Sequence, residues 1–234
     1  PAYIISSNGT RHYLSAEPID ERVIEEMLGV GKQLFFPTLS TKLKKELEKG
    51  SWILDVGAYN GSWGGEILTQ YPKAQCIYME PSPERSVNVE KMIQINKLAN
   101  RTQLFPSGIA AKNGDAWLVK SNDGSWGDWL EYDKPANSED MLKVSTMTLE
   151  KALNNIKPII IKCNAEGGEF ELVKQILQVG LNPHLMILMI HPEMGNVEEL
   201  ESSLLKAGYF IDVVKNHPRR PVWHVTIKSP RVLS

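Results

Sequence analysis

The sequence is poor in cysteine and has no long apolar run. Its 234 residues include two cysteines, Cys76 and Cys163, and both lie in apolar stretches, so a disulfide framework is excluded and we expect buried, reduced thiols. No stretch approaches the roughly 18 to 20 continuous apolar residues of a membrane span, and no basic region followed by an apolar core marks a signal peptide at the N-terminus. The composition therefore predicts a cytoplasmic protein of enzyme size that does not act at a membrane.

Neither sign of charge predominates. The chain has 26 Lys and Arg against 28 Asp and Glu, a formal net charge of −2, which disfavours a broad positive surface for DNA or RNA. Motifs typical of metal sites are missing as well, because there is no HExxH and no paired-cysteine motif, and pairs such as His191 with Glu193 are too sparse for a ligand set. We predict no nucleic-acid partner and no metal.

The first fifty residues predict a hairpin followed by helices. An Asn-Gly dipeptide at positions 8 and 9 lies between two β-prone runs, and it accepts the positive φ values of a tight type I′ turn. Apolar residues at near-helical spacing predict a helix over 18–31, and a highly charged stretch predicts a second over 39–49. The length suits one large domain, so we expect an N-terminal extension, 1–50, and a domain over 51–234.

From residue 51 onward, short apolar runs alternate with amphipathic helical stretches. This alternation is typical of a mostly parallel sheet with helices on both faces, so the predicted fold class is α/β. The predicted strands cover 52–56, 75–80, 102–110, 116–120, 143–148, 158–165, 185–190, 210–214 and 222–227. The predicted helices cover 64–71, 83–98, 169–179 and 197–207. Only a Pro-rich basic loop joins the last two strands, which predicts an antiparallel pair at the sheet edge.

A glycine-rich loop, GAYNGSWGG, follows the first strand of this domain. Ligands of open α/β sheets bind at the carboxyl ends of the strands, where glycines let a ligand approach the backbone. The spacing is GxxxGxxG and not the dinucleotide fingerprint GxGxxG, and Asp55 before the loop would crowd a pyrophosphate. The loop therefore favours a cofactor without bridging phosphates, although a plain tight turn explains Gly57 and Gly61 about equally well.

Glu80 ends the second strand about 20 residues beyond the glycines, where an acidic residue pairs with ribose hydroxyls in a βαβ unit. A carboxylate just before the helix that starts at Pro83 also gains from the helix dipole. The two roles are compatible, and the spacing favours a nucleoside site.

At this point the sequence resembles the FkbM-type S-adenosylmethionine-dependent methyltransferases, which have the Rossmann-like class I fold. DVGAYNGSW resembles the family's DVGANxG motif, and IYMEPSPERSVNVEKMIQIN is similar to its acidic loop and following helix. LFPSGIAAKNGDAWL, STMTLEKAL and IIIKCNAEGGEFELV resemble three further family segments, in the family's order. The resemblance covers Trp52 to Glu193 and implies a seven-stranded sheet and S-adenosyl-L-methionine as cofactor.

The resemblance also implies site residues. The methionine end of the cofactor would lie on a turn made of Asp55, Gly57, Ala58, Tyr59, Asn60, Gly61 and Ser62. Glu80 would hold the ribose, with Pro81 and Ser82 shaping the loop beside it. The adenine face would meet the end of the third strand, formed by Ser107, Gly108, Ile109 and Ala110, for which a buried strand end is the alternative.

A second group of polar residues ends a strongly apolar strand. Lys162, Asn164 and Glu166 alternate along the chain and so point to one side, where burial without partners would cost a few kcal/mol each. They form either an active site or a capped helix start with Lys162 as a counter-charge. The family usually has Asp at the position of Asn164, and an amide can orient an acceptor but cannot take its proton.

Two residues could replace the missing base. Glu166 is one, and His191, at the end of another buried strand, is expected to titrate near neutrality. A hydrogen-bonded structural histidine before Pro192 is the alternative. We therefore name His191, Glu166, Asn164 and Lys162 as candidate catalytic residues.

Two loops are candidates for acceptor contacts. Trp126, Trp129 and Tyr132 lie in a polar, glycine-containing stretch and suit stacking on a ring-bearing substrate, or else they pack on the core or on a second subunit. The loop with Lys215 and Arg220 is basic and either steers an anionic acceptor or is simply solvated.

The sequence thus predicts methyl transfer to an oxygen acceptor, a hydroxyl of a sugar or secondary metabolite. Two alternatives stay open: a non-catalytic S-adenosylmethionine-binding protein, motivated by Asn164, and a nicotinamide-dependent oxidoreductase. The sequence fixes neither the acceptor nor the oligomeric state.

Overall fold

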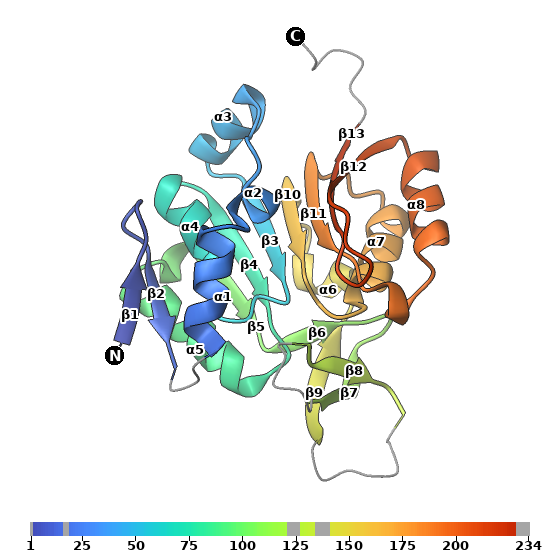
Figure 1. Cartoon of the computed structure of the whole chain (residues 1–234), viewed down its shortest axis with the longest axis horizontal. Coiled ribbons are helices and arrows are strands. Elements are labelled where there is room, and N and C mark those ends of the chain that lie inside the picture. The colour runs from blue at the N-terminus through green and yellow to red at the C-terminus, as the bar shows by residue number, and fades with distance from the viewer. Residues whose placement is uncertain (1, 16–18, 121–126, 134–140, 228–234) are drawn as a thin grey trace.

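The structure, a computed structural model, describes residues 2–15, 19–120, 127–133 and 141–227. It contains a central seven-stranded sheet, a four-stranded sheet beside it and a two-stranded N-terminal hairpin (Figure 1). The hairpin pairs β1 (Ala2–Ile5) with β2 (Arg11–Leu14) in antiparallel register, which confirms the predicted hairpin. The predicted tight type I′ turn is wrong, because that turn requires a positive φ at both Asn8 and Gly9, and only Gly9 has one, at 91°.

The central sheet has the order β12-β13-β11-β10-β3-β4-β5. Five strands, from β11 to β5 in that order, are parallel, and β13 runs antiparallel to both β11 and β12. The bounds are β3 Trp52–Val56, β4 Gln75–Met79, β5 Thr102–Phe105, β10 Ile160–Cys163, β11 Leu185–Met189, β12 Tyr209–Lys215 and β13 Val222–Ile227. This order confirms the predicted α/β fold with an antiparallel C-terminal strand.

Helices cover both faces of the central sheet. Successive side chains of β3 alternate between two cores: Ile53 packs with residues of α3, α4 and α5, and Leu54 packs with residues of α6, α7 and α8. The bounds are α1 Ile19–Leu28, α2 Lys32–Phe35, α3 Thr41–Lys49, α4 Ser62–Gln70, α5 Pro83–Ile95, α6 Leu149–Leu153, α7 Gly168–Gln178 and α8 Val197–Lys206, with short 3-10 helices at Ala99–Arg101 and Pro192–Met194. Within the described residues, no helix is both long and apolar enough to cross a bilayer.

One predicted strand, 102–110, is wrong as a single element. The chain leaves the central sheet at Pro106, which has no N–H to donate to a ladder, and β6 (Ser107–Ile109) pairs instead with β9 (Met141–Met147). With β7 (Gly114–Val119) and β8 (Trp129–Glu131) these strands form the four-stranded sheet, in the order β6-β9-β7-β8. Figure 1 shows this sheet below the central one.

The N-terminal extension shares a core with the rest of the chain. Met27 and Leu47 pack in one buried cluster with Trp63 of α4. The indole of Trp63 donates to the carbonyl of Phe35 at 2.8 Å, and His224 Nε2 lies 2.7 Å from the carbonyl oxygen of Leu34. These contacts hold α1 and α2 beside the carboxyl ends of the central strands.

Candidate functional site

A cavity of about 1130 Å³ opens at the carboxyl ends of the parallel strands. Its walls come from the loops after β3, β4 and β10, from α1 and α2, and from β6 and β8 of the smaller sheet. Ligand sites commonly enclose about 300 to 1,000 Å³, so the space accommodates a nucleoside cofactor together with a small second molecule.

The cavity brings together most of the cofactor residues that the sequence predicts. Its lining includes Gly57, Ala58, Tyr59, Asn60, Glu80, Pro81, Ser107, Gly108 and Ile109. Other predicted residues lie behind this lining, namely Asp55, Gly61, Ser62, Ser82 and Ala110. Ser62, for example, places its hydroxyl 2.9 Å from Nδ1 of His12 in the hairpin, and Ala110 N donates to the carbonyl of Met147.

Gly57 forms the turn that starts the loop. Its φ is +67°, and a Cβ there would lie 1.9 Å from the carbonyl oxygen of Asn164, so no other residue fits. The Gly57 N–H donates to the carbonyl of Met79 at 3.0 Å. The turn therefore joins the ends of β3, β4 and β10 into one surface at the cavity.

Glu80 lies at the tip of β4 and is 3 % exposed. Its Oε2 accepts from the N–H of Tyr59 at 2.8 Å, and its Oε1 accepts from the N–H of Ser82 at 3.0 Å. Burial raises the pKa of Glu80, while the positive charge of Arg85 opposes the rise. A carboxylate held in this way keeps free lone pairs for two neighbouring hydroxyl donors.

Beneath the glycine turn, Lys162 and Asp55 form a buried ion pair. Lys162 Nζ donates to Asp55 Oδ1 at 2.9 Å and to the carbonyl of Gly57 at 2.7 Å. Burial raises the pKa of Asp55, and Lys162 acts against that rise. The pair ties β3 to β10, so Lys162 braces the turn with two of its three donors.

Two residues of the lining keep a buried polar atom without a partner in the described part of the chain. These atoms are Nδ2 of Asn60 and Oδ1 of Asn164. Buried polar groups are rarely left unpaired, and one donor and one acceptor beside a cavity fit a ligand with both kinds of group, such as an amino acid. The residues present therefore fit the methionine end of S-adenosylmethionine.

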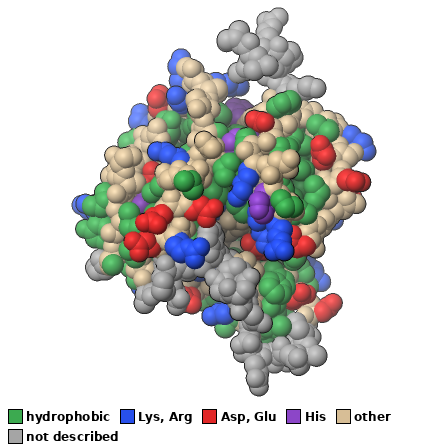
Figure 2. Space-filling view, viewed as in Figure 1, with side chains coloured by type: hydrophobic (Ala, Val, Ile, Leu, Met, Phe, Trp, Pro, Cys, Tyr) green, Lys and Arg blue, Asp and Glu red, His purple; other side chains and the backbone are tan. Residues whose placement is uncertain are grey.

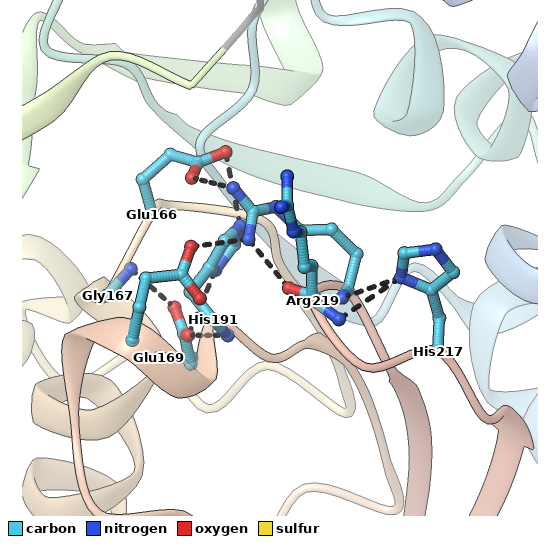
Figure 3. Close-up of polar contacts among 8 residues, drawn as sticks. Glu166, Gly167, Glu169, His191, His217 and Arg219 are labelled. Atoms are coloured by element: carbon cyan, nitrogen blue, oxygen red, sulfur yellow. Dashed lines mark hydrogen bonds and ion pairs between the residues drawn. The ribbon is translucent and has the colours of Figure 1, made fainter.

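His191 lies between two carboxylates (Figure 3). Its Nδ1 is 3.0 Å from Glu169 Oε1, and its Nε2 is 3.1 Å from Glu166 Oε1. Burial acts to lower the pKa of His191, but the two carboxylates outweigh it and raise the pKa to about 9. The predicted titration near neutrality is therefore wrong: the imidazole is protonated at neutral pH, it is fully buried, and it does not line the cavity.

Glu166, Asn164 and Lys162 do line the cavity. Glu166 adopts a positive φ of 41°, and its Oε2 lies 3.3 Å from Nη2 of Arg220, in the loop between β12 and β13. Nη1 of Arg220 also contacts Glu193, at 2.5 Å. The basic loop is therefore joined to the site, and Glu166 carries a cation on each oxygen.

One of the three aromatic residues proposed for acceptor contacts lies at the cavity. Tyr132 and Leu130 line the cavity, whereas Trp129 does not and donates to Glu131 at 3.0 Å. Trp126 lies outside the described residues.

Sequence reasoning missed the contacts that Arg85 makes in the cavity wall. The guanidinium of Arg85 lies over the ring of Tyr59, 4.8 Å from its centroid, and pairs with Asp128 at 3.0 Å. It also missed the face of α1 that lines the cavity, which includes Glu26 and Met27. The only signal in the sequence for the cavity-lining face of α1 was the helical spacing of its apolar residues. No group of three or more potential ligands for a metal ion occurs among the residues the structure describes.

The fold and this site define a Rossmann-like class I methyltransferase. The model of the methyltransferase FkbM domain matches residues 55–211, and the chain therefore belongs to the FkbM methyltransferase family. The protein is an S-adenosylmethionine-dependent methyltransferase, so the alternative of a nicotinamide-dependent oxidoreductase is wrong.

Three solved structures are similar to this chain, and the first of them, with a TM-score above 0.5, supports the fold. StiE O-MT, residues 961–1257, has a TM-score of 0.54 and 9% identity, over 91% of this chain and 78% of that one. An O-methyltransferase family protein from Burkholderia thailandensis has a TM-score of 0.45 and 10% identity, over 92% and 61% of the two chains. TrmK of M. capricolum, solved with S-adenosyl-homocysteine, has a TM-score of 0.45 and 11% identity, over 82% and 69%. No curated protein matches the sequence.

Proposed function

We propose that this methyltransferase acts on a hydroxyl oxygen of a small molecule, a sugar or secondary metabolite, in the cytoplasm, and does not act on nucleic acid. The observation that carries the proposal is the second half of the cavity. Beyond the residues around Glu80, the lining continues to Met27 and Phe35 on one side and to Glu166 and Met194 on the other. A concave space of this size suits a small acceptor better than a polymer.

The residues of the chain divide the work of binding. Glu80 would accept hydrogen bonds from the ribose hydroxyls, the turn from Gly57 to Asn60 would hold the amino-acid end, and Pro81 with Gly108 would contact the adenine. S-Adenosylmethionine, when bound, would supply a methyl group whose C–S bond breaks, with its electron pair left on sulfur, as the acceptor oxygen forms the new C–O bond and its proton passes to solvent water. Holding the two reactants in line can lower the barrier by about 7 to 11 kcal/mol.

Two measurements test the proposal. S-Adenosylhomocysteine should bind in a calorimeter, and mass spectrometry should then show transfer of one methyl group to members of a panel of sugars, phenols and other small hydroxyl compounds. A single-stranded RNA and a DNA duplex serve as negative controls. Methylation of a nucleic acid would refute the proposed acceptor class.

Two features of the site also support a second candidate, a member of the methyltransferase family that binds the cofactor and has lost catalysis. Asn164 is an amide and cannot accept a proton, and the carboxylates beside His191 raise its pKa to about 9. Binding of S-adenosylhomocysteine with no methyl transfer to any member of the panel would favour this candidate.

A further inference from the structure

The acceptor side of the site offers no free base at the carboxyl ends of β10 and β11. Asn164 is an amide and cannot accept a proton. Both ring nitrogens of His191 lie beside carboxylates, at 3.0 and 3.1 Å, and these carboxylates favour the protonated ring over a free base. Glu166 places one oxygen on this imidazole and the other on Arg220. Lys162 is held by Asp55 and by a backbone carbonyl. Each ionisable side chain of this group therefore already has a protein partner.

The other carboxylates that line the cavity are also candidates for the base that would take the acceptor's proton. Three of them accept hydrogen bonds or form ion pairs with protein groups: Glu80, Asp128 and Glu171. Two more, Glu26 on α1 and Glu199 on α8, line the cavity without a partner in the described part of the chain. Glu199 is exposed and Glu26 half-buried, so Glu26 is the stronger rival for a base.

A free cation lies at the same end of the sheet. Lys215, the last residue of β12, lines the cavity and is half-buried, and no hydrogen bond or ion pair holds its ammonium within the described residues. It is opposite Val222 in β13, and Val222 is opposite Met189 at the end of β11. Arg220 lies two positions before Val222, so both cations stand at the strand ends. Figure 2 shows basic side chains gathered over this loop, with acidic side chains over α1.

We propose that the acceptor of the proposed reaction reaches this site already as an oxygen anion, a phenol, enol or carboxylic acid ionised at neutral pH, and that Lys215 beside Arg220 binds the anion. The inference rests on the proposed function and narrows it, because an aliphatic or sugar hydroxyl keeps its proton at neutral pH. An oxygen anion forms the new bond with its own electron pair, so the protein has no proton to take. The lack of a free base at the carboxyl ends of β10 and β11 is then no obstacle, and Asn164 suffices to orient the acceptor.

Binding tests the proposal without relying on turnover. The protein is first saturated with S-adenosylhomocysteine, and calorimetry then compares 4-nitrophenol with neutral 4-nitrobenzyl alcohol at a pH between the pKa of 4-nitrophenol and that of His191. We expect the phenolate to bind about tenfold or more tightly, which corresponds to about 1.4 kcal/mol. Lys215→Gln should remove most of this difference. Lys206→Gln, an exposed lysine of α8, should leave it unchanged.

The outcomes separate the two proposals. Failure of S-adenosylhomocysteine to bind would overturn the proposed function itself. If it binds, equal affinity for the two probes, or no affinity for either, would overturn the anionic acceptor alone. Methyl transfer with S-adenosylmethionine adds a second arm: Glu26→Gln and Glu199→Gln should still methylate the phenolate. Methylation of the neutral alcohol that is lost in Glu26→Gln would make Glu26 a general base and refute the inference.

Discussion

The buried group of His191, Glu166 and Glu169 should make the stability of the protein depend on alkaline pH. The folded protein raises the pKa of His191 from 6.5 to about 9. A group whose pKa is higher in the folded state contributes its full stability below its unfolded pKa and loses it as the pH rises through its folded pKa. Each pKa unit corresponds to about 1.4 kcal/mol, so the shift is equivalent to about 3 kcal/mol.

The perturbation is His191→Gln, which removes the titrating ring, takes away the cation beside Glu169 and leaves Glu166 with Arg220 alone. Urea unfolding measured from pH about 6 to about 10 should show the wild type losing about 3 kcal/mol more than the variant, with the loss spread over the range from the unfolded pKa of 6.5 to the folded pKa of about 9. Other groups titrate in both proteins and cancel in the difference. His217→Gln, at an exposed position, should keep the wild-type dependence. Parallel curves for wild type and His191→Gln would refute the assignment of a protonated, ion-paired imidazole.

Three further substitutions test the cofactor half of the site. Glu80→Gln should weaken binding of S-adenosylhomocysteine at least about tenfold in calorimetry, because a hydrogen bond to a charged group contributes about 1.5 to 3 kcal/mol. Glu84→Gln, at an exposed position, is the control. An unchanged Kd in Glu80→Gln would contradict the ribose role of Glu80. Gly57→Ala should lower the melting temperature far more than Gly180→Ala. The two glycines have nearly the same φ, +67° at Gly57 and +65° at Gly180, but only at Gly57 would the added Cβ meet another atom, at 1.9 Å. Equal losses in melting temperature would show that the clash is relieved. Lys162→Met should lower the free energy of unfolding in urea by about 3 to 5 kcal/mol, because it leaves Asp55 unpaired. Adding Asp55→Asn should restore part of the lost stability. A double variant as unstable as the single one would count against the ion pair.

Features encoded by local spacing were predictable from the sequence. The glycine turn and Glu80 follow strands with clear apolar patterns, and both lie at the cavity. The break at Pro106 was available in the sequence, because proline cannot donate to a ladder, but the apolar residues on either side of it favoured one continuous strand.

Contacts between distant elements were not predictable. His191 was placed correctly at a strand end, but its pKa depends on Glu166 and Glu169, whose distances from the ring arise from the register of β10 and β11 and from the start of α7. The stacking of Arg85 on Tyr59 likewise joins a helix to a loop of another βα unit. Sequence spacing fixes the edge at which such residues meet, and tertiary packing fixes which of them touch.

The contact between the hairpin and α4 has a consequence for dissecting the chain. His12 is fully buried, and its ring joins Ser62, the first residue of α4, at 2.9 Å to Glu66, one turn further on, at 2.7 Å. Cutting the chain at residue 51 would remove His12 from Glu66, uncover Trp63 next to the cofactor loop and take Met27 and Phe35 out of the cavity wall. The hairpin thus supports the start of α4, and a shortened enzyme would lose both this support and part of the wall of its cavity.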